Sequence, residues 1–468
     1  FKLMRWLRYE FRQLKTYSYG NSQVKEGKHV IAYEPSWLIY DSLYLNYPFE
    51  LLSDMIIGEY DVNPASGFAR NDSAVGAFRN KDIVEVGTAV NGDLNVLMAV
   101  TDYGDFGYRT KFLGEVAKKN LINSLDLILD EMNTKRDCPE ERPKLGVVMD
   151  FPNVTRNLRK DYAEFMSRLN KDLDNREQNK QCLIYCVVPA DDPYEMYKDS
   201  IFATAMVENV DLFILRAHKF TNIEENPGAH GAMVPMIWPK QVSLDSAVRY
   251  YTDHGFIPKS KLAVEIPYYG RKWVNDSVMD GVRPLIPLSE IVNINEDVAK
   301  RQLDTNSLSW YKTIEDTTYF YEDTLSLNVK YDWIARQGLA GVSLYGTGYG
   351  HALDDTKMEF GLWQTVANHF AEPSPRLLFA SVGFLLCFFG LGIIVSVVGS
   401  WEVRHALREK MGKFWYYLGL LTCMIIATIC CVLPVNVVPI IWKLLSLALL
   451  LIFPLGRRAF RWIFRAAR

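Results

Sequence analysis

Residues 145–150 read LGVVMD, a short apolar run that ends on a carboxylate, Asp150. A run of this length and composition is typical of a buried strand. Seven further runs of the same kind lie at 29–34, 54–59, 94–100, 183–188, 211–215, 262–266 and 341–345. Segments with helical periodicity lie between them, for example 113–132 and 162–173.

Eight strands that alternate with helices over residues 28–370 predict an α/β fold, a (β/α)₈ TIM-type barrel. A doubly wound open sheet would produce a similar alternation, so the pattern alone leaves both folds open. In a barrel, Asp150 would lie at the C-terminal end of its strand, which is where such folds place their ligand sites.

Charge is divided unevenly along the 468 residues, although the formal net charge is only −3. Residues 372–468 carry a net charge of +8, and the preceding residues carry −11. An acidic globular part excludes the usual nucleic-acid binder, which needs a basic face.

Three apolar segments near the C-terminus are each long enough to cross a bilayer. Segments 377–399 and 414–433 contain no charge, and 435–455 contains only Lys443. We therefore expect three domains: a basic amphipathic segment at 1–27, a barrel at 28–371 and a membrane domain at 372–468. The first segment could lie on lipid or on a partner, or be an ordinary surface helix.

The basic residues around these segments predict their orientation. Loop 400–413 and the tail after Leu455 are both rich in Lys and Arg, whereas the link between the second and third segments has no charge. The C-terminus should then be cytoplasmic and the barrel extracytoplasmic, in a cell membrane such as a bacterial inner membrane. Membrane lipid and membrane protein subunits that pack on the three spans are the expected partners.

Three of the seven cysteines lie outside the predicted spans, at 138, 182 and 186. Cys138 and Cys182 precede adjacent predicted strands. They could form a disulfide in an oxidising compartment, or they could be two free buried thiols. No cysteine or histidine spacing fits a metal site, and there is no phosphate-binding loop, so we expect neither metal nor cofactor.

Several stretches together resemble glycoside hydrolase family 18, the chitinase family, and especially its spore peptidoglycan hydrolase-like branch. They are HVIAYEPSW at 29–37, LGVVMDFPNV at 145–154, the segment 246–273 that ends in YYGRKW, and the segment 321–350. The resemblance covers residues 28–365 and implies a barrel. It also implies an N-acetylhexosamine-containing glycan as the ligand class.

The chain departs from the family pattern where catalysis is carried out. The resemblance places the family's catalytic Glu at Pro152, which has no titratable group. Other acidic positions of that motif are Leu145 and Val148, and the Met-x-Tyr-Asp motif of the sixth strand reads Arg216-Ala217-His218-Lys219. The Trp expected on the eighth strand is Tyr345. These changes predict that hydrolysis has been lost.

A ligand groove remains possible without catalysis. The candidate groove residues are Asp102, Asp150, Arg216, His218, Tyr268, Trp273 and Tyr345. Most of them have a structural alternative: Asp150 could form a salt bridge with Arg216 or Lys219, Asp102 could belong to an ordinary loop, and the aromatic residues could pack at the rim.

Three functions follow as hypotheses. The first is a catalytically inactive chitinase-like scaffold or binding subunit of a bacterial envelope membrane complex. The second is a glycan-binding module of a polysaccharide or peptidoglycan synthesis or export system. The third is a glycosidase with a displaced catalytic acid.

Overall fold

The computed structural model describes residues 22–35, 38, 44, 47–79, 87–88, 90–102, 104, 106, 108–134, 144–151, 154–174, 182–190, 200–217, 234, 243–254, 257–274, 277–278, 285–292, 294, 300–305, 307–348 and 356–373. Within these residues, no helix combines the length and the apolar character that a membrane crossing requires. The three predicted spans lie outside them.

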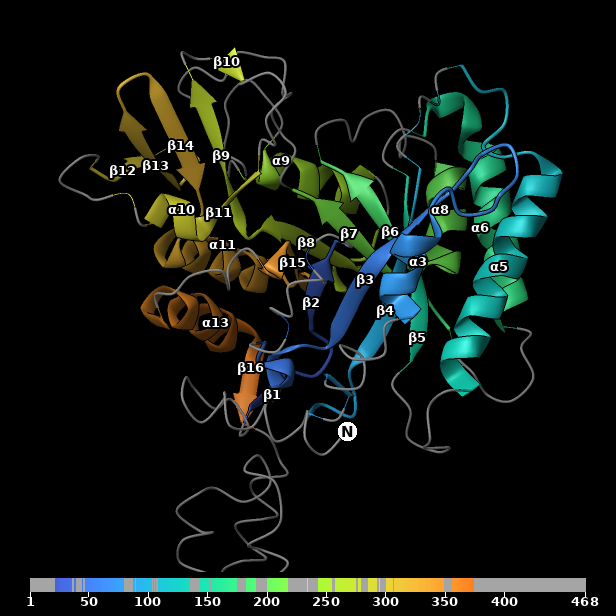
Figure 1. Ribbon diagram of the computed structural model, residues 1–468, viewed down its shortest axis with the longest axis horizontal. Coiled ribbons are helices and arrows are strands. Elements are labelled where there is room, and N and C mark those ends of the chain that lie inside the picture. Colours follow the sequence, from blue (N-terminus) through green and yellow to red (C-terminus); the bar gives the residue numbers. More distant parts are fainter. Residues whose placement is uncertain are drawn as a thin grey trace, which may run out of the picture. The chain divides into compact units, whose positions relative to one another are not determined.

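A closed barrel of eight parallel strands forms the centre of the protein (Figure 1). In spatial order its strands are β15 (Gly341–Tyr345), β2 (His29–Glu34), β3 (Asp54–Asp61), β4 (Asn95–Thr101), β5 (Leu145–Asp150), β6 (Leu183–Pro189), β7 (Leu212–Arg216) and β8 (Leu262–Pro267). Because β15 pairs with β2 on one side and β8 on the other, the sheet has no free edge. The barrel is confirmed over the open sheet.

Strand bounds agree closely with the sequence pattern. Three strands begin and end where predicted, and the other five differ by one or two residues at an end. Several of these differences extend the strand onto a polar residue, such as Asp61, Thr101 or Arg216. The apolar pattern stops there, but the hydrogen-bonded ladder continues toward the mouth of the barrel, the end formed by the C-terminal ends of its strands.

The interior of the barrel is filled by side chains from alternate positions of the strands. Its buried members include Ile31, Ile56, Leu97, Val148, Val187, Ile214 and Ala263. Near its N-terminal end, β15 needs a glycine, because a Cβ at Gly341 would lie 1.8 Å from the carbonyl oxygen of His29.

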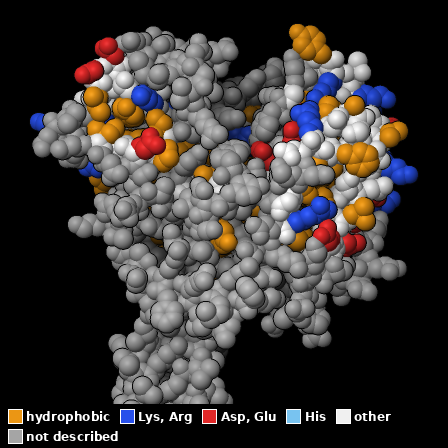
Figure 2. Space-filling model, in the orientation of Figure 1, with side chains coloured by type: hydrophobic (Ala, Val, Ile, Leu, Met, Phe, Trp, Pro, Cys, Tyr) orange, Lys and Arg blue, Asp and Glu red, His pale blue; other side chains and the backbone are white. Residues whose placement is uncertain are grey.

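Helices surround the barrel (Figure 1). They are α3 (Asp72–Arg79), α5 (Glu115–Thr134), α6 (Arg159–Asp174), α8 (Ser200–Asn209), α9 (Leu244–Arg249), α11 (Thr324–Arg336) and α13 (Thr356–Phe370). Short helical turns lie at Phe49–Leu51, Arg156–Leu158, Tyr250–His254 and Lys259–Lys261. The predicted helices 113–132 and 162–173 correspond to α5 and α6. Charged side chains of both signs and scattered hydrophobic ones cover this part of the surface (Figure 2).

An antiparallel sheet is inserted between β8 and α11, and the sequence pattern did not predict it. Its strands are β9 (Tyr269–Val274), β10 (Ser277–Val278), β11 (Leu285–Pro287), β12 (Gln302–Asp304), β13 (Ser309–Ile314) and β14 (Thr317–Tyr321), with the short helix α10 (Leu288–Val292) after β11. The predicted seventh strand, 262–266, ends one residue later, at Pro267. The strand-forming residues of β9 begin after a single residue, so periodicity cannot show that the chain leaves the barrel there.

A buried ion pair attaches this sheet to α11. Lys330 on α11 donates to Glu322 Oε1 (2.5 Å) and to Ser309 Oγ (2.9 Å), and all three residues are buried. Burial lowers the pKa of Lys330 in spite of the neighbouring carboxylate.

The chain divides into two compact units, residues 1–17 with 24–371 and residues 18–23 with 372–468. The barrel and the inserted sheet belong to the first. The described part of the second comprises the ends of two short paired strands, β1 (Ser22–Val24) and β16 (Ala371–Pro373). Gln23 Nε2 donates to Glu372 Oε1 over 3.1 Å.

Candidate functional site

Polar side chains gather inside the mouth of the barrel. We call Tyr33, Asp150, Arg216 and Glu265 the mouth cluster; they come from β2, β5, β7 and β8. Each lies an even number of positions from an interior residue of its strand, which places it inside the barrel. None is more than 3% exposed.

One guanidinium joins the two carboxylates of the mouth cluster. Arg216 Nη2 donates to Asp150 Oδ2, and its Nε donates to Glu265 Oε1 over 3.3 Å. Tyr33 adds a long hydrogen bond to Asp150 Oδ2 (3.5 Å). The salt bridge between Asp150 and Arg216 was one of the two alternatives that the sequence left open.

Sequence reasoning missed Glu265. The signal was present, because Glu265 is the only charged residue of the strand LAVEIP and occupies one of its inward positions. A carboxylate in such a place needs a charged partner, and Arg216 is the partner supplied by the adjacent strand.

Tyrosine rings lie beside the mouth cluster. The ring of Tyr345 is 4.9 Å from that of Tyr33 and 6.1 Å from that of Tyr269, measured between centroids. Tyr33 and Tyr269 are buried, whereas Tyr345 is half-buried. Burial raises the pKa of Tyr269, which the charge of nearby Arg271 only partly offsets. Tyr345 is therefore the ring of this trio that reaches solvent.

A third acid, Glu34, lies at the same end of the barrel but on the outer face of its strand. Glu34 follows Tyr33 and is 1% exposed. Its Oε1 accepts a hydrogen bond from the backbone N–H of Gly348 (3.1 Å). Burial raises the pKa of Glu34 to about 7, and the hydrogen bonds from Tyr47, Thr347 and Gly348 offset only part of that rise.

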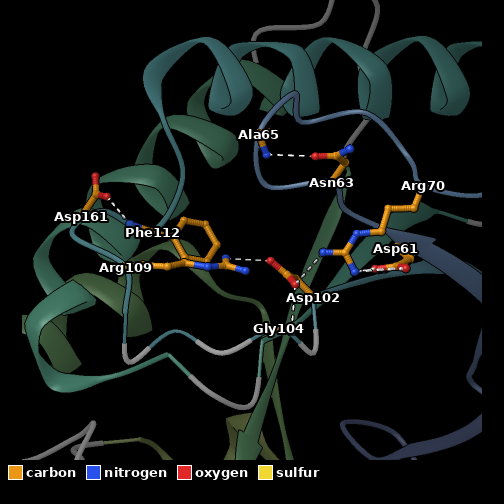
Figure 3. A network of polar contacts seen from close by, with 9 residues as sticks. All are labelled: Asp61, Asn63, Ala65, Arg70, Asp102, Gly104, Arg109, Phe112 and Asp161. Carbon is orange, nitrogen blue, oxygen red and sulfur yellow. Dashed lines mark hydrogen bonds and ion pairs between the residues drawn. The ribbon is translucent and has the colours of Figure 1, made fainter.

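Asp102 links two loops at the rim of the mouth (Figure 3). Its carboxylate is fully buried and accepts from Arg109 Nη1 (2.7 Å), from Arg70 Nη2 (3.4 Å) and from the backbone N–H of Gly104 (2.9 Å). Arg70 also pairs with Asp61 (3.2 Å). The sequence left two interpretations of Asp102 open, a groove residue and a residue of an ordinary loop. Its hydrogen bonds to the two loops favour the second.

The other predicted groove residues divide into two groups. Tyr268 is buried and its hydroxyl lies 3.2 Å from that of Tyr331 on α11, so it packs against this helix, and its place in the groove stays a prediction. The chain turns out of the barrel at this residue, which points it toward the helices. Outside the described residues lie His218, Pro152 and the side chain of Trp273. Cys138 also lies outside them, so its disulfide with Cys182 stays a prediction. Cys182 itself is half-buried and directly precedes β6. The described residues hold no group of acids, His and Cys suited to a metal.

A further polar cluster lies at the opposite end of the barrel, the bottom. We call it the bottom cluster: His29, Ser53, Asp54, Asn95 and Tyr185. Asp54 is fully buried and accepts from the other four, over 2.7, 2.5, 2.8 and 2.7 Å respectively. Burial by itself raises the pKa of Asp54, but the bonds and charge of His29 outweigh it, and the net shift is downward. For His29 the signs are opposite: burial lowers its pKa, but the hydrogen bond and the charge of Asp54 outweigh burial, and the net shift is upward.

Solved chitinase structures share this fold. The chain is 17% identical to the group IV chitinase of Ostrinia furnacalis, with a TM-score of 0.59 over 73% of this chain and 99% of that one. It is 14% identical to the Cycas revoluta family 18 chitinase solved with (GlcNAc)3, with a TM-score of 0.58 and the same shares covered. Human YKL-39, described as a pseudo-chitinase with retained chitooligosaccharide binding, gives 17% identity, a TM-score of 0.58 and the same shares.

Sequence comparison gives the family. A search of curated proteins found no match. The family model described as glycosyl hydrolases family 18 matches residues 30–350, which span the whole barrel from β2 to β15 and include the inserted sheet. The chain therefore belongs to glycosyl hydrolase family 18.

Proposed function

We propose that the barrel binds an N-acetylhexosamine-containing glycan without hydrolysing it. The observation that carries the proposal is the state of Asp150, the one acid of the fourth-strand motif that this chain keeps. Its carboxylate is paired with Arg216, and Pro152 stands where the motif has its catalytic Glu.

Glycoside hydrolysis needs a carboxylic acid that can protonate the leaving oxygen. Proline cannot do this. The acid that this chain keeps, Asp150, is already paired with the buried guanidinium of Arg216, which also bonds Glu265 and fills space inside the barrel.

The rings beside the mouth cluster support glycan binding. Aromatic faces pack on the apolar faces of sugars, and Tyr345 is the partly exposed ring of the tyrosine trio. The fold relative human YKL-39 is described as a pseudo-chitinase that retains chitooligosaccharide binding, which makes a binding function without hydrolysis a precedent for this fold.

Calorimetry with chitohexaose, together with chromatographic analysis of the same mixture, tests the proposal. We expect binding without cleavage, and a loss of about five- to thirty-fold in affinity for Tyr345→Ala. Leu127→Ala, an exposed residue of α5, is the control and should bind as the parent does.

Two results would contradict the proposal. The absence of binding at millimolar chitohexaose would exclude this class of glycan as the ligand. Cleavage that disappears in Asp150→Asn would instead support the third hypothesis, a glycosidase with a displaced acid.

We further propose that segments 377–399, 414–433 and 435–455 anchor the barrel on the extracytoplasmic face of a cell membrane, next to partner subunits. The length of the apolar runs and the basic residues that flank them support this. We expect the full chain to stay in the membrane fraction after carbonate extraction and to co-purify with other membrane proteins in mild detergent. Extraction by carbonate would contradict the anchor, and a clean monomer would contradict the partners.

A further inference from the structure

We propose that the rim of the barrel beside β3 and β4 binds an acidic glycan, through two exposed aromatic side chains and the cations around them. This rests on the proposed glycan-binding function and adds the charge of the ligand. We call Phe68, Arg70, Tyr108, Arg109, Lys111, Val116 and Lys119 the rim patch. Its residues come from the loop after β3, the loop after β4 and the first turns of α5.

Hydrophobic side chains are unusually exposed in the rim patch. Seven large hydrophobic side chains of the described residues are exposed, and three of them lie here: Phe68 (53%), Tyr108 (91%) and Val116 (71%). Figure 2 shows hydrophobic side chains between Lys and Arg on this part of the surface. Apolar groups gathered at a ligand-binding end of a fold indicate a contact surface.

The loop that carries Phe68 is held in place, so its exposure is built into the fold. Val62 and Ala69 form a β-bridge, and the N–H of Asn63 donates to the carbonyl of Phe68 (2.8 Å). Gly67 has a φ of +81°, and a Cβ there would lie 2.0 Å from the carbonyl oxygen of Ala117. Only glycine lets the loop approach α5 this closely, which places the backbone next to Phe68 against the first turn of α5.

The loop that carries Tyr108 is anchored from below. The guanidinium of Arg109 lies 4.0 Å above the ring of Phe106, which in turn contacts the rings of Phe112 and Phe151. Arg109 and Arg70 reach the buried carboxylate of Asp102 from opposite sides, which ties the two loops together (Figure 3). A surface that is ordered before the ligand arrives loses less entropy on binding.

Charge selects the ligand class. Lys111 and Lys119 face solvent, as do the outer parts of Arg70 (41% exposed) and Arg109 (18% exposed), whereas Asp102 is fully buried. Two acids at the edge of the patch also reach solvent, and both are paired: Asp61 (34% exposed) with Arg70, and Glu115 (66% exposed) with Lys118 and Arg168. Sugar rings fit the aromatic side chains, and carboxylate or sulfate groups fit the cations.

Two matched ligands test this: a hyaluronan hexasaccharide and its carboxyl-reduced form. We expect the acidic form to bind at least about fivefold more tightly at low salt, with the advantage disappearing near 1 M salt because the charges are then screened. Tyr108→Ala and Phe68→Ala should weaken both ligands, and the double variant Lys111→Gln/Lys119→Gln should remove only the preference for the acidic one. Leu127→Ala is the control. Tyr108 and both lysines are exposed, so these variants should fold.

Three results would overturn the inference. One is equal binding of the two hexasaccharides, and another is unchanged binding by Tyr108→Ala. The third is binding of anionic phospholipid vesicles, lost in Tyr108→Ala, with no binding of either hexasaccharide; this would assign the patch to a membrane surface. Chitohexaose separates the two proposals: if it binds while the acid preference is absent, the proposed function stands and this inference fails.

Discussion

Two buried aspartates lie inside the same barrel, Asp150 at the mouth and Asp54 at the bottom. Asp54 has one histidine and three neutral donors, all within 2.8 Å. Asp150 pairs with Arg216, which also bonds Glu265, and it accepts a long bond from Tyr33. The bottom cluster thus surrounds one acid mainly with neutral donors, whereas in the mouth cluster two carboxylates share a guanidinium. A buried hydrogen bond adds to the stability of the fold. A buried ion cluster adds little by itself, but the removal of one of its charges is strongly destabilising.

The largest effect should come from Arg216→Met, which removes the guanidinium that two buried carboxylates share. We expect a loss of about 3–5 kcal/mol in the free energy of unfolding at pH 7, measured by urea denaturation. The triple variant Arg216→Met/Asp150→Asn/Glu265→Gln should recover most of that loss, since the two carboxylates that Arg216 pairs with are then neutral amides. If Arg216→Met alone unfolded with a free energy within about 1 kcal/mol of the parent's, the two carboxylates would not depend on Arg216 for their charge pairing.

Glu34 should give the mouth a pH dependence of its own. Its pKa of about 7 in the folded state against 4.5 in the unfolded chain corresponds to about 3 kcal/mol. Between these values the folded state holds a proton that the unfolded state has lost, so stability falls as pH rises from about 4.5 to above 7. Glu34→Gln should remove this fall, and Glu208→Gln, on the exposed surface of α8, should leave it in place. Parallel urea midpoints of parent and Glu34→Gln at pH 5 and pH 8 would contradict the assignment.

The bottom cluster should respond to pH in another way. Asp54 has a lowered pKa, so its contribution is present above its unfolded pKa and is lost as pH falls through the folded value. His29 has a raised pKa, so its contribution is present below about 6.5 and is lost as pH rises through the folded value. Asp54→Asn should cost about 1–3 kcal/mol and lower the pKa of His29 in an NMR titration. An unchanged His29 titration would disprove the coupling.

The smallest effect should come from Tyr185→Phe, which removes one of the four donors to Asp54. We expect a loss of about 1 kcal/mol, because Asn95 still donates to the same oxygen. Tyr311→Phe, whose hydroxyl bonds Gln302 in an exposed pair, is the matched control and should cost less. A Tyr185→Phe loss as large as that of Asp54→Asn would mean that the hydroxyl positions the whole cluster.

Most of the barrel could be predicted, because each of its strands is a short apolar run between helical segments. The inserted sheet could not, since the strand-forming residues of Tyr269–Val274 follow β8 after a single residue and nothing in the periodicity says that they leave the barrel. The site was predicted in part. Asp150 and Arg216 were identified as partners, but Glu265 and Tyr33 were missed, and Tyr268, which was assigned to the groove, packs on α11.

By itself, the sequence determined the eight alternating strand and helix segments, the proline at 152, where the family resemblance places the catalytic acid, and the separation of charge along the chain. These depend on residue type and on local periodicity, which a sequence states directly. Only the tertiary structure decided which charges meet. Asp150, Arg216 and Glu265 stand on β5, β7 and β8, and Phe68 and Tyr108 stand on loops that Asp102 brings together. Closure of the sheet sets these distances between residues far apart in the chain, and no local pattern encodes them.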